Sequence, residues 1–506
     1  MSITEAEGVK MLSGHVVLFP FPAAGHIAPF IPFAKSLARY GVAITFMCPK
    51  NEISKLKRSI TEDESFDARE NVILVPFEIP TEDGLDLVTF DVLKHFMYKN
   101  VEKFDEIIAH YIEESRSIKY PSRSSSGPPV CIVSDMFMGF TQGTAEKFSI
   151  VRYCLFASPV HFLSLLFHLP KFNDENLIPV KKGDEPLMIP NFPPIPAGDL
   201  PPSQQADNGN PGSHFFLLNE TKQMWKAAGV LVNSVEEIER PVLEGLQRYI
   251  DETMSGDQGP KISTFGPLVD GCGEGKLSLR DKLREMKEGG DWYDWLSQQP
   301  DSSVLYMCFG TVAMLSDEQI RQMAIALENS GQRFFWALRL RRNETGAPQD
   351  VSRVFPEGFL QRTKSKGLVY FDWAPQLHIL AHRAIKGFVT HCGWNSTMES
   401  ILMGVPTIGW PMQAEQMLNA IFLDKVLGIS IRINKTAGWK DMISSDTFER
   451  AIHTLMVDPS GETMKAKVLQ ISDTVEKAAR PGGSSRINLE SFVQDVRRMA
   501  SGGVNS

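Results

Sequence analysis

One segment of the chain combines residue types that could bind a diphosphate. Within residues 373–416, a strand is expected to end before His391, and a helix is expected to begin near Asn395 and Ser396. Backbone N–H groups at a helix N-terminus attract anions, and these three side chains offer further hydrogen-bond donors. The sequence contains no Asp-x-Asp pair of the kind that holds a metal–diphosphate. The pattern therefore predicts a diphosphate site that works without a metal.

Two further residues of this segment have alternative explanations. Glu399 follows Ser396 by three positions, which is the spacing of a capping box, so its carboxylate could cap the helix instead of binding a ligand. Trp373 stands at the end of an expected strand, where its ring could stack on a base or fill the core. Residue types and spacing leave both questions open.

A second candidate pair is His26 with Asp135. His26 lies in the loop between the first expected strand and the first expected helix, and Asp135 ends the expected strand at 130–134. Because ligands bind beyond the carboxyl ends of parallel strands, both should face the same cleft. Histidine has a pKa suited to taking a proton from a hydroxyl, and a carboxylate on its second nitrogen fixes the tautomer. The alternatives are a loop histidine satisfied by its neighbours and an aspartate that caps a helix.

The elements expected around these residues alternate between strand and helix. Residues 15–20 are apolar and rich in β-branched types, residues 28–40 have helical spacing, and residues 42–48 form a second strand. Such strand–helix–strand units imply a parallel sheet. Further strands are expected at 72–77, 130–134, 153–157 and 230–233, and then at 304–309, 334–338, 368–371, 385–390 and 406–409. The chain is therefore expected to be an α/β protein with two doubly wound, Rossmann-like domains that face each other across a cleft.

Residues 251–260 have the composition of a linker and indicate a boundary between the two domains. We expect a first domain at 1–255, a second domain at 256–484 and a C-terminal helix within 485–506. This helix carries one apolar stripe, which consists of Leu489, Phe492, Val493 and Val496. The stripe predicts that the helix packs back against the first domain.

Composition excludes several other classes of protein. Of 506 residues, 52 are Lys or Arg and 61 are Asp or Glu, so the formal net charge is −9 and a basic nucleic-acid footprint is absent. The six cysteines show no Cys-x-x-Cys spacing, which favours buried thiols in a reducing compartment. The uncharged stretches 11–34 and 153–170 contain prolines and histidines that do not suit a membrane span, and the first ten residues lack the net positive charge of a signal peptide. We expect a cytoplasmic protein.

Motifs of two other enzyme classes are missing. No Gly-x-Gly-x-x-Gly fingerprint follows the first expected strand, and no Gly-x-Ser-x-Gly elbow occurs. Residues 271–276 are similar to a phosphate loop but lack its spacing and the Ser or Thr after its lysine. The sequence therefore argues against a dinucleotide oxidoreductase and a serine hydrolase.

Residues 373–416 closely resemble the signature box of plant secondary-product UDP-glycosyltransferases, a family with the two-domain architecture called GT-B. The resemblance extends along the chain in shorter motifs. These are PFPAAGHIAPF at 20–30, VSDMF at 133–137, LVNSVEEIE at 231–239, TFGPL at 264–268, VLYMCFGT at 304–311 and GGSSRINLESFV at 482–493.

The resemblance implies a role for each candidate residue. His26 would be the base and Asp135 its partner. Trp373 would stack on uracil, with Ala374 and Gln376 near uracil and ribose, and Glu399 would accept the ribose hydroxyls. The residues implied at the diphosphate are Thr311, His391, Asn395 and Ser396, and those implied at the sugar are Trp394, Glu415 and Gln416. Phe21, Phe137, Phe156 and the irregular residues 184–215 would line the acceptor pocket. No metal ligand is implied.

The function implied is inverting, metal-independent transfer of a sugar, expected to be glucose, from a UDP-sugar to a hydroxyl of a small apolar acceptor such as a phenolic, flavonoid or terpenoid. The UDP-sugar would be a co-substrate, and no separate cofactor is implied. Glu415 stands where the family more often has aspartate, which could change the sugar hydroxyls it accepts. Two alternatives stay open, namely another UDP-sugar donor and a UDP-sugar-binding protein without catalysis. We expect small-molecule partners, no nucleic acid, no transmembrane segment and a monomer.

Overall fold

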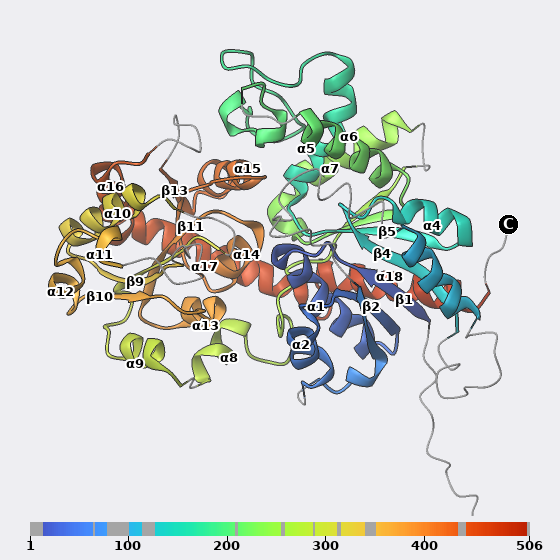
Figure 1. Cartoon of the computed structure of the whole chain (residues 1–506), viewed down its shortest axis with the longest axis horizontal. Helices are drawn as coiled ribbons and strands as arrows, with labels where there is room; N and C mark the ends of the chain where they lie inside the picture. The colour runs from blue at the N-terminus through green and yellow to red at the C-terminus, as the bar shows by residue number, and fades with distance from the viewer. Residues whose placement is uncertain are drawn as a thin grey trace, which may run out of the picture.

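The computed structural model describes residues 14–63, 66–77, 101–113, 127–207, 211–254, 259–286, 289–310, 315–339, 351–433 and 442–502. Two parallel β-sheets, each covered by helices, lie side by side (Figure 1). The first sheet has seven strands and the second has six among the described residues. Two doubly wound α/β domains are therefore present, as the strand–helix alternation predicts.

The first sheet has the strand order β3-β2-β1-β4-β5-β6-β7. Its strands are β1 (His15–Phe19), β2 (Ala43–Pro49), β3 (Val72–Phe77), β4 (Pro129–Asp135), β5 (Val151–Phe156), β6 (Gly229–Val232) and β7 (Lys261–Thr264). The helices of this domain are α1 (Ala24–Arg39), α2 (Ile53–Leu56), α4 (Thr141–Phe148), α5 (Val160–Asp174), α6 (Pro211–Trp225) and α7 (Glu236–Thr253), and residues 101–113 are also helical. Every residue of β1 and β2 is buried, because helices cover both faces of a parallel sheet.

The second sheet has the strand order β10-β9-β8-β11-β12-β13. Its strands are β8 (Val304–Cys308), β9 (Arg333–Ala337), β10 (Gly367–Tyr370), β11 (Ile385–Thr390), β12 (Thr407–Gly409) and β13 (Ser430–Arg432). The remaining helices are α8 (Leu279–Glu285), α9 (Asp291–Ser297), α10 (Asp317–Ser330), α11 (Val351–Val354), α12 (Phe359–Thr363), α13 (Gln376–Ala381), α14 (Trp394–Leu402), α15 (Gln416–Ile421), α16 (Ser445–Met456), α17 (Pro459–Ala479) and α18 (Ser484–Ala500).

The strand order of each sheet reverses at one point, where ligands of doubly wound folds bind. In the first sheet this point lies between β1 and β4, which pair in parallel with Phe19 opposite Ser134. In the second sheet it lies between β8 and β11, with Thr390 opposite Cys308. Both reversal points thus lie next to candidate residues, because His26 follows β1, Asp135 ends β4 and His391 follows β11.

The boundary between the domains lies later than residue 255. Strand β7 pairs in parallel with β6 and forms the edge of the first sheet, so this sheet extends to Thr264. The expected linker at 251–260 instead includes the end of α7 and the approach to β7, which is a connection inside one domain. The short strand β7 (KIST) carries no apolar run that would mark it as part of the first sheet.

Helix α18 lies against the first sheet and contacts β1, β4 and β7. Its apolar stripe is buried in one core with residues of the first domain; these stripe residues are Leu489, Phe492, Val493 and Val496. Figure 1 shows α17 and α18, in red, running from the second domain into the first. Helix α18 therefore packs on the domain that contains β1.

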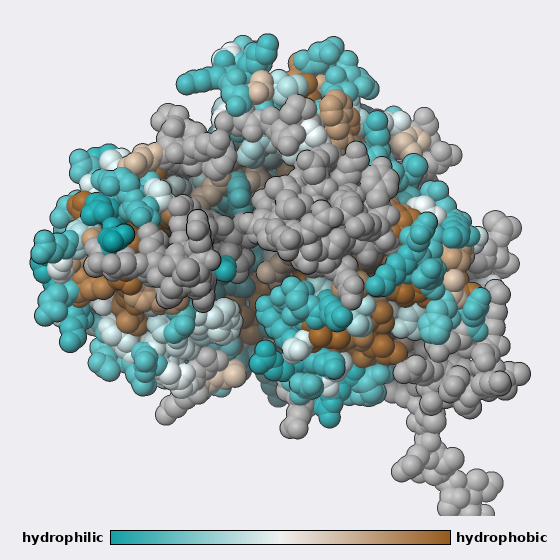
Figure 2. Space-filling view, in the orientation of Figure 1, coloured by the Kyte–Doolittle hydropathy of each residue, from teal (hydrophilic) through white to brown (hydrophobic). Residues whose placement is uncertain are grey.

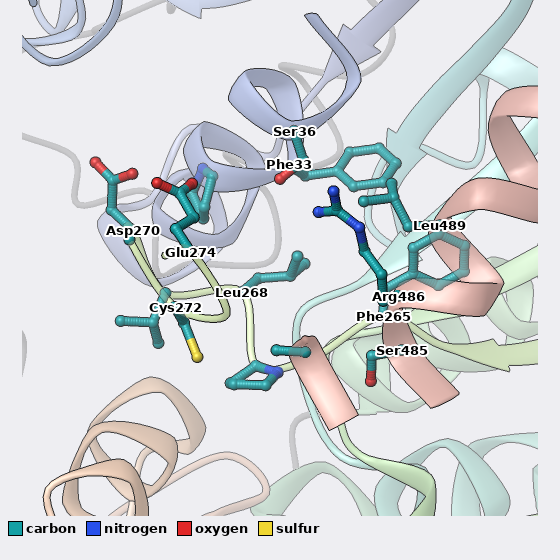
Figure 3. Close-up of a pocket in the computed structure, with 15 residues that line it drawn as sticks. Phe33, Ser36, Phe265, Leu268, Asp270, Cys272, Glu274, Ser485, Arg486 and Leu489 are labelled. Carbon is teal, nitrogen blue, oxygen red and sulfur yellow. The ribbon is translucent and has the colours of Figure 1, made fainter. Parts of the chain in front are cut away.

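A small pocket of about 50 Å³ lies where α1, the segment after β7 and the start of α18 meet. Figure 3 shows Phe33 of α1, Leu268 of the connecting segment and Leu489 of α18 around it. Beside it, Lys35 pairs with Asp270 at 2.6 Å. No candidate site residue lines this pocket, which belongs to the join between the domains.

The described residues include no helix that is both long enough and apolar enough to cross a membrane. Figure 2 shows the outer surface of the face seen in Figure 1, where a furrow separates the second domain on the left from the first on the right.

The six cysteines are all unpaired, and Cys48, Cys131, Cys154 and Cys392 are buried.

Candidate active site

His26 and Asp135 form a hydrogen-bonded pair at the reversal point of the first sheet. Nδ1 of His26 lies 2.8 Å from Oδ2 of Asp135, whose carboxylate is fully buried. The second oxygen of Asp135 accepts the backbone N–H of Phe137 at 3.0 Å. Because an ionised carboxylate only accepts hydrogen bonds, Nδ1 donates and Nε2 carries the lone pair. The pair has the arrangement of a histidine base that is oriented by a carboxylate.

The charges around His26 raise its pKa. Burial alone would lower this pKa, but the carboxylates of Asp135 and Glu415 outweigh burial, so the pKa lies above its usual 6.5. Asp135 belongs to the first domain and Glu415 to the second, directly before α15. His26 therefore lies between negative charges from both domains.

Aromatic side chains surround the imidazole of His26. The ring of Phe21 contacts it edge-on at 5.2 Å between centroids, and Phe137 lies at the same distance on another side. Phe216 of α6 packs on Phe137 at 5.6 Å. Phe156 was expected here but is fully buried in the core against Phe162. Side chains alternate along β5, and the sequence does not fix which face of that strand points inward.

Helix α1 begins at Ala24, four residues before the start expected from spacing, so His26 lies in its first turn. Pro29 is inside this helix and has no N–H to donate to the carbonyl of Gly25. The side-chain amide of Asn395 in the second domain donates to that carbonyl at 2.8 Å. Asn395 therefore joins the two domains, and the diphosphate contact expected of it stays a prediction.

The turn before α14 has the features of an anion site. The helix starts at Trp394 and has Gly393 as its N-cap, with no side chain capping it, and Cys392 has a positive φ of 62°. The ring of His391 lies so close to Gly310 that a Cβ on this glycine would come within 2.9 Å of it. Burial lowers the pKa of His391 to about 4, so its imidazole is neutral. Nδ1 of His391 is buried and has no hydrogen-bond partner in the described part of the chain.

Ser396, Gln376 and Glu399 are joined by hydrogen bonds. Nε2 of Gln376 donates to Oγ of Ser396 at 2.9 Å and to Oε2 of Glu399 at 2.7 Å. Glu399 does not cap α14, which excludes the capping alternative. Burial raises the pKa of Glu399 to about 7, against the lowering effect of the Gln376 hydrogen bond. The carboxyl group of Glu399 is thus held at the site by its neighbour.

Trp373 is 81% exposed and lies after β10, so it is not a core residue. Its ring is free to stack on a planar group, as the resemblance implies. Ala374 beside it is only partly buried and packs against the core. The exposure excludes a core role for Trp373, and stacking on a base stays a prediction.

Glu415 and Gln416, which are expected at a sugar, differ in the hydrogen bonds that their side chains make. Oε1 of Glu415 accepts from Oγ of Ser158 in the first domain at 3.3 Å. Oε1 of Gln416 accepts the backbone N–H groups of Met412 and Gln413 at 2.9 and 3.0 Å, so its Nε2 is the group that can donate to a ligand. Each of the two keeps one end of its side chain available for hydroxyl groups.

Trp394 is 3% exposed, and its indole N–H donates to the carbonyl of Asn233 in the first domain at 2.5 Å. Its ring therefore joins the domains, and the contact with a sugar that is expected of Trp394 stays a prediction. A tryptophan in the first turn of a helix can point toward the site or away from it, and the sequence does not specify the orientation of its side chain. Thr311, expected at the diphosphate, lies outside the described residues.

Sequence reasoning did not single out Phe216, Asn233 or Ser158. Asn233 lies within the motif LVNSVEEIE, where its side chain also accepts the backbone N–H of Leu268 at 2.8 Å, so that motif held the available signal. Phe216 and Ser158 have no local pattern that marks them. In the described ranges, no group of three His, Cys, Asp or Glu side chains is placed to hold a metal ion.

Two doubly wound parallel sheets, with a His–Asp pair at one reversal point and the uncapped start of α14 at the other, define a two-domain nucleotide-sugar transferase of the GT-B fold. The comparisons with known proteins agree. A family model described as UDP-glucoronosyl and UDP-glucosyl transferase matches residues 290–477.

Relatives match over nearly the whole chain. UDP-glycosyltransferase 71B7 of Arabidopsis thaliana is 31% identical over 96% of this chain and 96% of its own length. The anthocyanidin 5,3-O-glucosyltransferase of a Rosa hybrid cultivar is 28% identical over 95% of this chain and 98% of its own length. The solved structure of Phytolacca americana UGT2, complexed with UDP-2fluoro-glucose and pterostilbene, has a TM-score of 0.76 at 27% identity and covers 96% of this chain and 99% of that one. The chain belongs to the family of plant UDP-glycosyltransferases, which confirms the resemblance.

Proposed function

We propose that this enzyme transfers glucose from UDP-glucose, with inversion, to a hydroxyl of a small apolar acceptor. The observation that carries the proposal is the His26–Asp135 pair at 2.8 Å, which faces Glu415 of the donor domain. A base in one domain and a sugar-binding carboxylate in the other are what a transfer between two bound substrates requires. Both halves of this site come from one chain, so the proposed reaction needs no second copy, and we propose a monomer.

The reaction begins at His26. Nε2 takes the proton of the acceptor hydroxyl while its oxygen attacks the anomeric carbon from the face opposite UDP. One displacement inverts that carbon. Asp135 stabilises the imidazolium that forms, because its carboxylate already accepts the Nδ1–H. Metal-independent departure of UDP rests on the positive end of α14 and on donors from His391 and Ser396.

Glucose as the donor sugar is supported by two relatives. One is named an anthocyanidin 5,3-O-glucosyltransferase, and one structure contains UDP-2fluoro-glucose. In this chain, Glu415 can accept from sugar hydroxyls and Nε2 of Gln416 can donate to them. We assign UDP stacking to Trp373 and ribose binding to Glu399, with Ala374 and Gln376 beside them.

A phenolic, flavonoid or terpenoid acceptor is supported by the aromatic rings around His26. Phe21, Phe137 and Phe216 form an apolar wall on which a flat or bulky apolar molecule can pack. The structure that contains pterostilbene and the relative named for anthocyanidin support the same chemistry. We place the enzyme in the cytoplasm, where its six unpaired cysteines would stay reduced.

The test is a mass-spectrometric screen. Purified protein is incubated with UDP-glucose and a panel of phenolics, flavonoids and terpenoids, beside the same reactions with UDP-galactose, UDP-xylose and UDP-glucuronate. We expect hexosylated product with UDP-glucose that is lost in His26→Ala. Binding of UDP-glucose without product from any acceptor and donor would instead identify a binding protein without catalysis.

A further inference from the structure

A buried arginine packs against residues 134–141, which comprise the end of β4, the loop before α4 and the first residue of α4. This segment, called the Asp135 loop, carries Asp135 and Phe137. Arg152 is on β5, beside β4, and is 2% exposed. Its Nε lies 2.9 Å from Oγ of Ser134 and 3.0 Å from Oγ1 of Thr141, which are the residues at the two ends of the loop. Thr141 also donates to the carbonyl of Met138 at 2.6 Å. Arg152 therefore ties together both ends of the loop that presents Asp135 and Phe137.

Helix α6 holds the same loop from a second side. Nη1 of Arg152 donates to the carbonyl of Gln223 at 3.1 Å, and Oε2 of the fully buried Glu220 accepts the backbone N–H of Gly139 at 2.8 Å. A Cβ at Gly139 would lie 2.4 Å from this carboxylate oxygen, so the loop and Glu220 fit without spare room. The loop is thus fixed by one buried cation and one buried carboxyl group.

Arg152 carries a buried charge and makes no direct ion pair with any residue that the structure describes. Its polar contacts are two hydroxyls and a carbonyl, and Nη2 has no partner among the described residues. The carboxyl groups that act on it electrostatically are Glu220 and Asp135. Burial raises the pKa of Glu220 to about 7, so this group is only partly ionised near neutral pH. Burying a guanidinium in this way costs folding free energy unless its charge stabilises a nearby group of opposite charge.

Arg152 interacts electrostatically with Asp135, which is hydrogen-bonded to His26. His26 is faced by Asp135 from β4 and by Glu415 from the second domain, and both favour the imidazolium. Asp135 is faced by Arg152 and the thiol of Cys154 on β5 and by Glu220 on α6. Among these groups Arg152 is the cation.

We propose that Arg152 is a positioning residue for the base: its buried charge offsets the carboxylates around His26, and its hydrogen bonds hold the loop that carries Asp135 and Phe137. The proposal rests on the proposed role of His26 as base. Without Arg152, His26 holds its proton to higher pH, so a smaller fraction of the enzyme carries the neutral imidazole that can accept a proton from the substrate. Glu220 acts in the opposite direction, since its negative charge favours the imidazolium.

Three variants separate charge from hydrogen bonding. Arg152→Met removes both, Arg152→Gln removes the charge but keeps a donor, and Glu220→Gln removes the negative charge but keeps an acceptor for Gly139. Lys147→Gln is the matched control, because it removes one positive charge from an exposed side chain on the next helix, α4. Solvent and salt screen that charge.

Two readouts are recorded on the full chain. One is the titration of the His26 imidazole by NMR with selectively labelled histidine, assigned with His26→Asn. The other is the pH dependence of kcat/KM. Thermal melts accompany both and show which variants are folded.

We expect the His26 midpoint to move upward, on the order of 0.5 to 1 pH unit, in Arg152→Met and Arg152→Gln. It should move downward, by less, in Glu220→Gln, because Glu220 is only partly ionised there. Lys147→Gln should leave it unchanged. The acid limb of kcat/KM should follow each shift, and the plateau should fall roughly tenfold or more in Arg152→Met but less in Arg152→Gln.

Unchanged His26 midpoints in folded Arg152→Gln and Glu220→Gln would overturn the proposal, and so would shifts in the same direction. If Arg152→Met does not fold, the His26 midpoints of Arg152→Gln and Glu220→Gln still test the proposal. NMR shifts of opposite sign in a protein that transfers no sugar would support the electrostatic part and contradict the proposed function instead.

Discussion

At the scale of single residues, the candidate site consists of groups whose protonation is set by their surroundings. Asp135 is buried, accepts two hydrogen bonds and orients His26. His391 is kept neutral by burial, with a pKa of about 4, whereas burial raises the pKa of Glu399 to about 7. One histidine is therefore suited to take a proton and the other to donate a hydrogen bond to an anion, although both belong to the same residue type.

The first prediction concerns Asp135. Asp135→Asn should lower kcat at every pH, because an amide holds the imidazole in the wrong tautomer and removes the charge that stabilises the imidazolium. It should also move the acid limb of kcat/KM to lower pH, since the carboxylate that raises the pKa of His26 is lost. A pH–rate profile of both proteins checks this. A limb that moves to higher pH would contradict the assignment.

The second prediction concerns Gln416. Its Oε1 is occupied by two backbone N–H groups, so only Nε2 is available to a sugar. Gln416→Ala should therefore reduce the preference for UDP-glucose over UDP-galactose more than it weakens UDP binding. Competing-donor assays and calorimetry with UDP measure the two effects. Equal losses in both would assign Gln416 to the support of the loop alone.

At the scale of elements, the positions of the reacting groups follow from strand order. His26 and Asp135 meet because β1 and β4 are neighbours at the reversal point, and the turn before α14 follows the corresponding strand of the second sheet. The C-terminal helix α18 completes the first domain by filling the face behind β1, β4 and β7.

The third prediction tests that helix. Phe492 is 3% exposed and packs edge-on against Tyr153 at 5.0 Å, so Phe492→Ala should cost about 3–5 kcal/mol of the free energy of unfolding. Ile487 on the same helix is 53% exposed, and Ile487→Ala is the control, with an expected change within about 0.5 kcal/mol. Chemical denaturation measures both. A similar small loss in the two variants would mean that α18 does not hold the first domain together.

Sequence reasoning located the elements that show a clear period or a clear motif. The alternation of strands and helices, the strand that ends at Asp135 and the apolar stripe of α18 were all visible, because burial imposes a period on the residues. The membership of β7 in the first sheet was not visible, since a four-residue strand has no period of its own. The orientations of Phe156 and Trp394 depend on packing between segments that are distant in sequence. The hydrogen bonds of Arg152 also depend on such packing, because they join β5, α6 and the loop after β4.

At the scale of the whole molecule, the two domains are joined through polar contacts beside the site. His161 of α5 lies 3.1 Å from Asn419 of α15, and Asn395 donates to Gly25. Arg432 at the end of β13 pairs with Asp199 of the first domain through Nη1 and Nη2, and Nη1 lies 3.0 Å from Oδ2 of Asp199. The relative position of base and donor turn is therefore fixed by specific hydrogen bonds.

The fourth prediction concerns the Arg432–Asp199 pair. Both side chains are nearly buried, so Arg432→Met should cost about 3–5 kcal/mol, because it leaves a buried carboxylate unpaired. The double variant Arg432→Met/Asp199→Leu should recover most of that loss. Arg383→Met breaks an exposed pair with Asp301 and should cost about 1 kcal/mol or less. Differential scanning calorimetry compares the three, and a double variant no better than the single one would argue against a buried pair.

The most direct test of the account is His26→Ala, assayed for transfer to a neutral phenol and for UDP binding in parallel. We predict that kcat/KM falls by about 10²–10⁴-fold, which is the usual contribution of a positioned base. The Kd of UDP should hardly change, because the proposed nucleotide contacts lie in the other domain, and an acceptor that is already ionised should lose least. A variant that loses UDP binding as severely as turnover would contradict the account and show that His26 is structural.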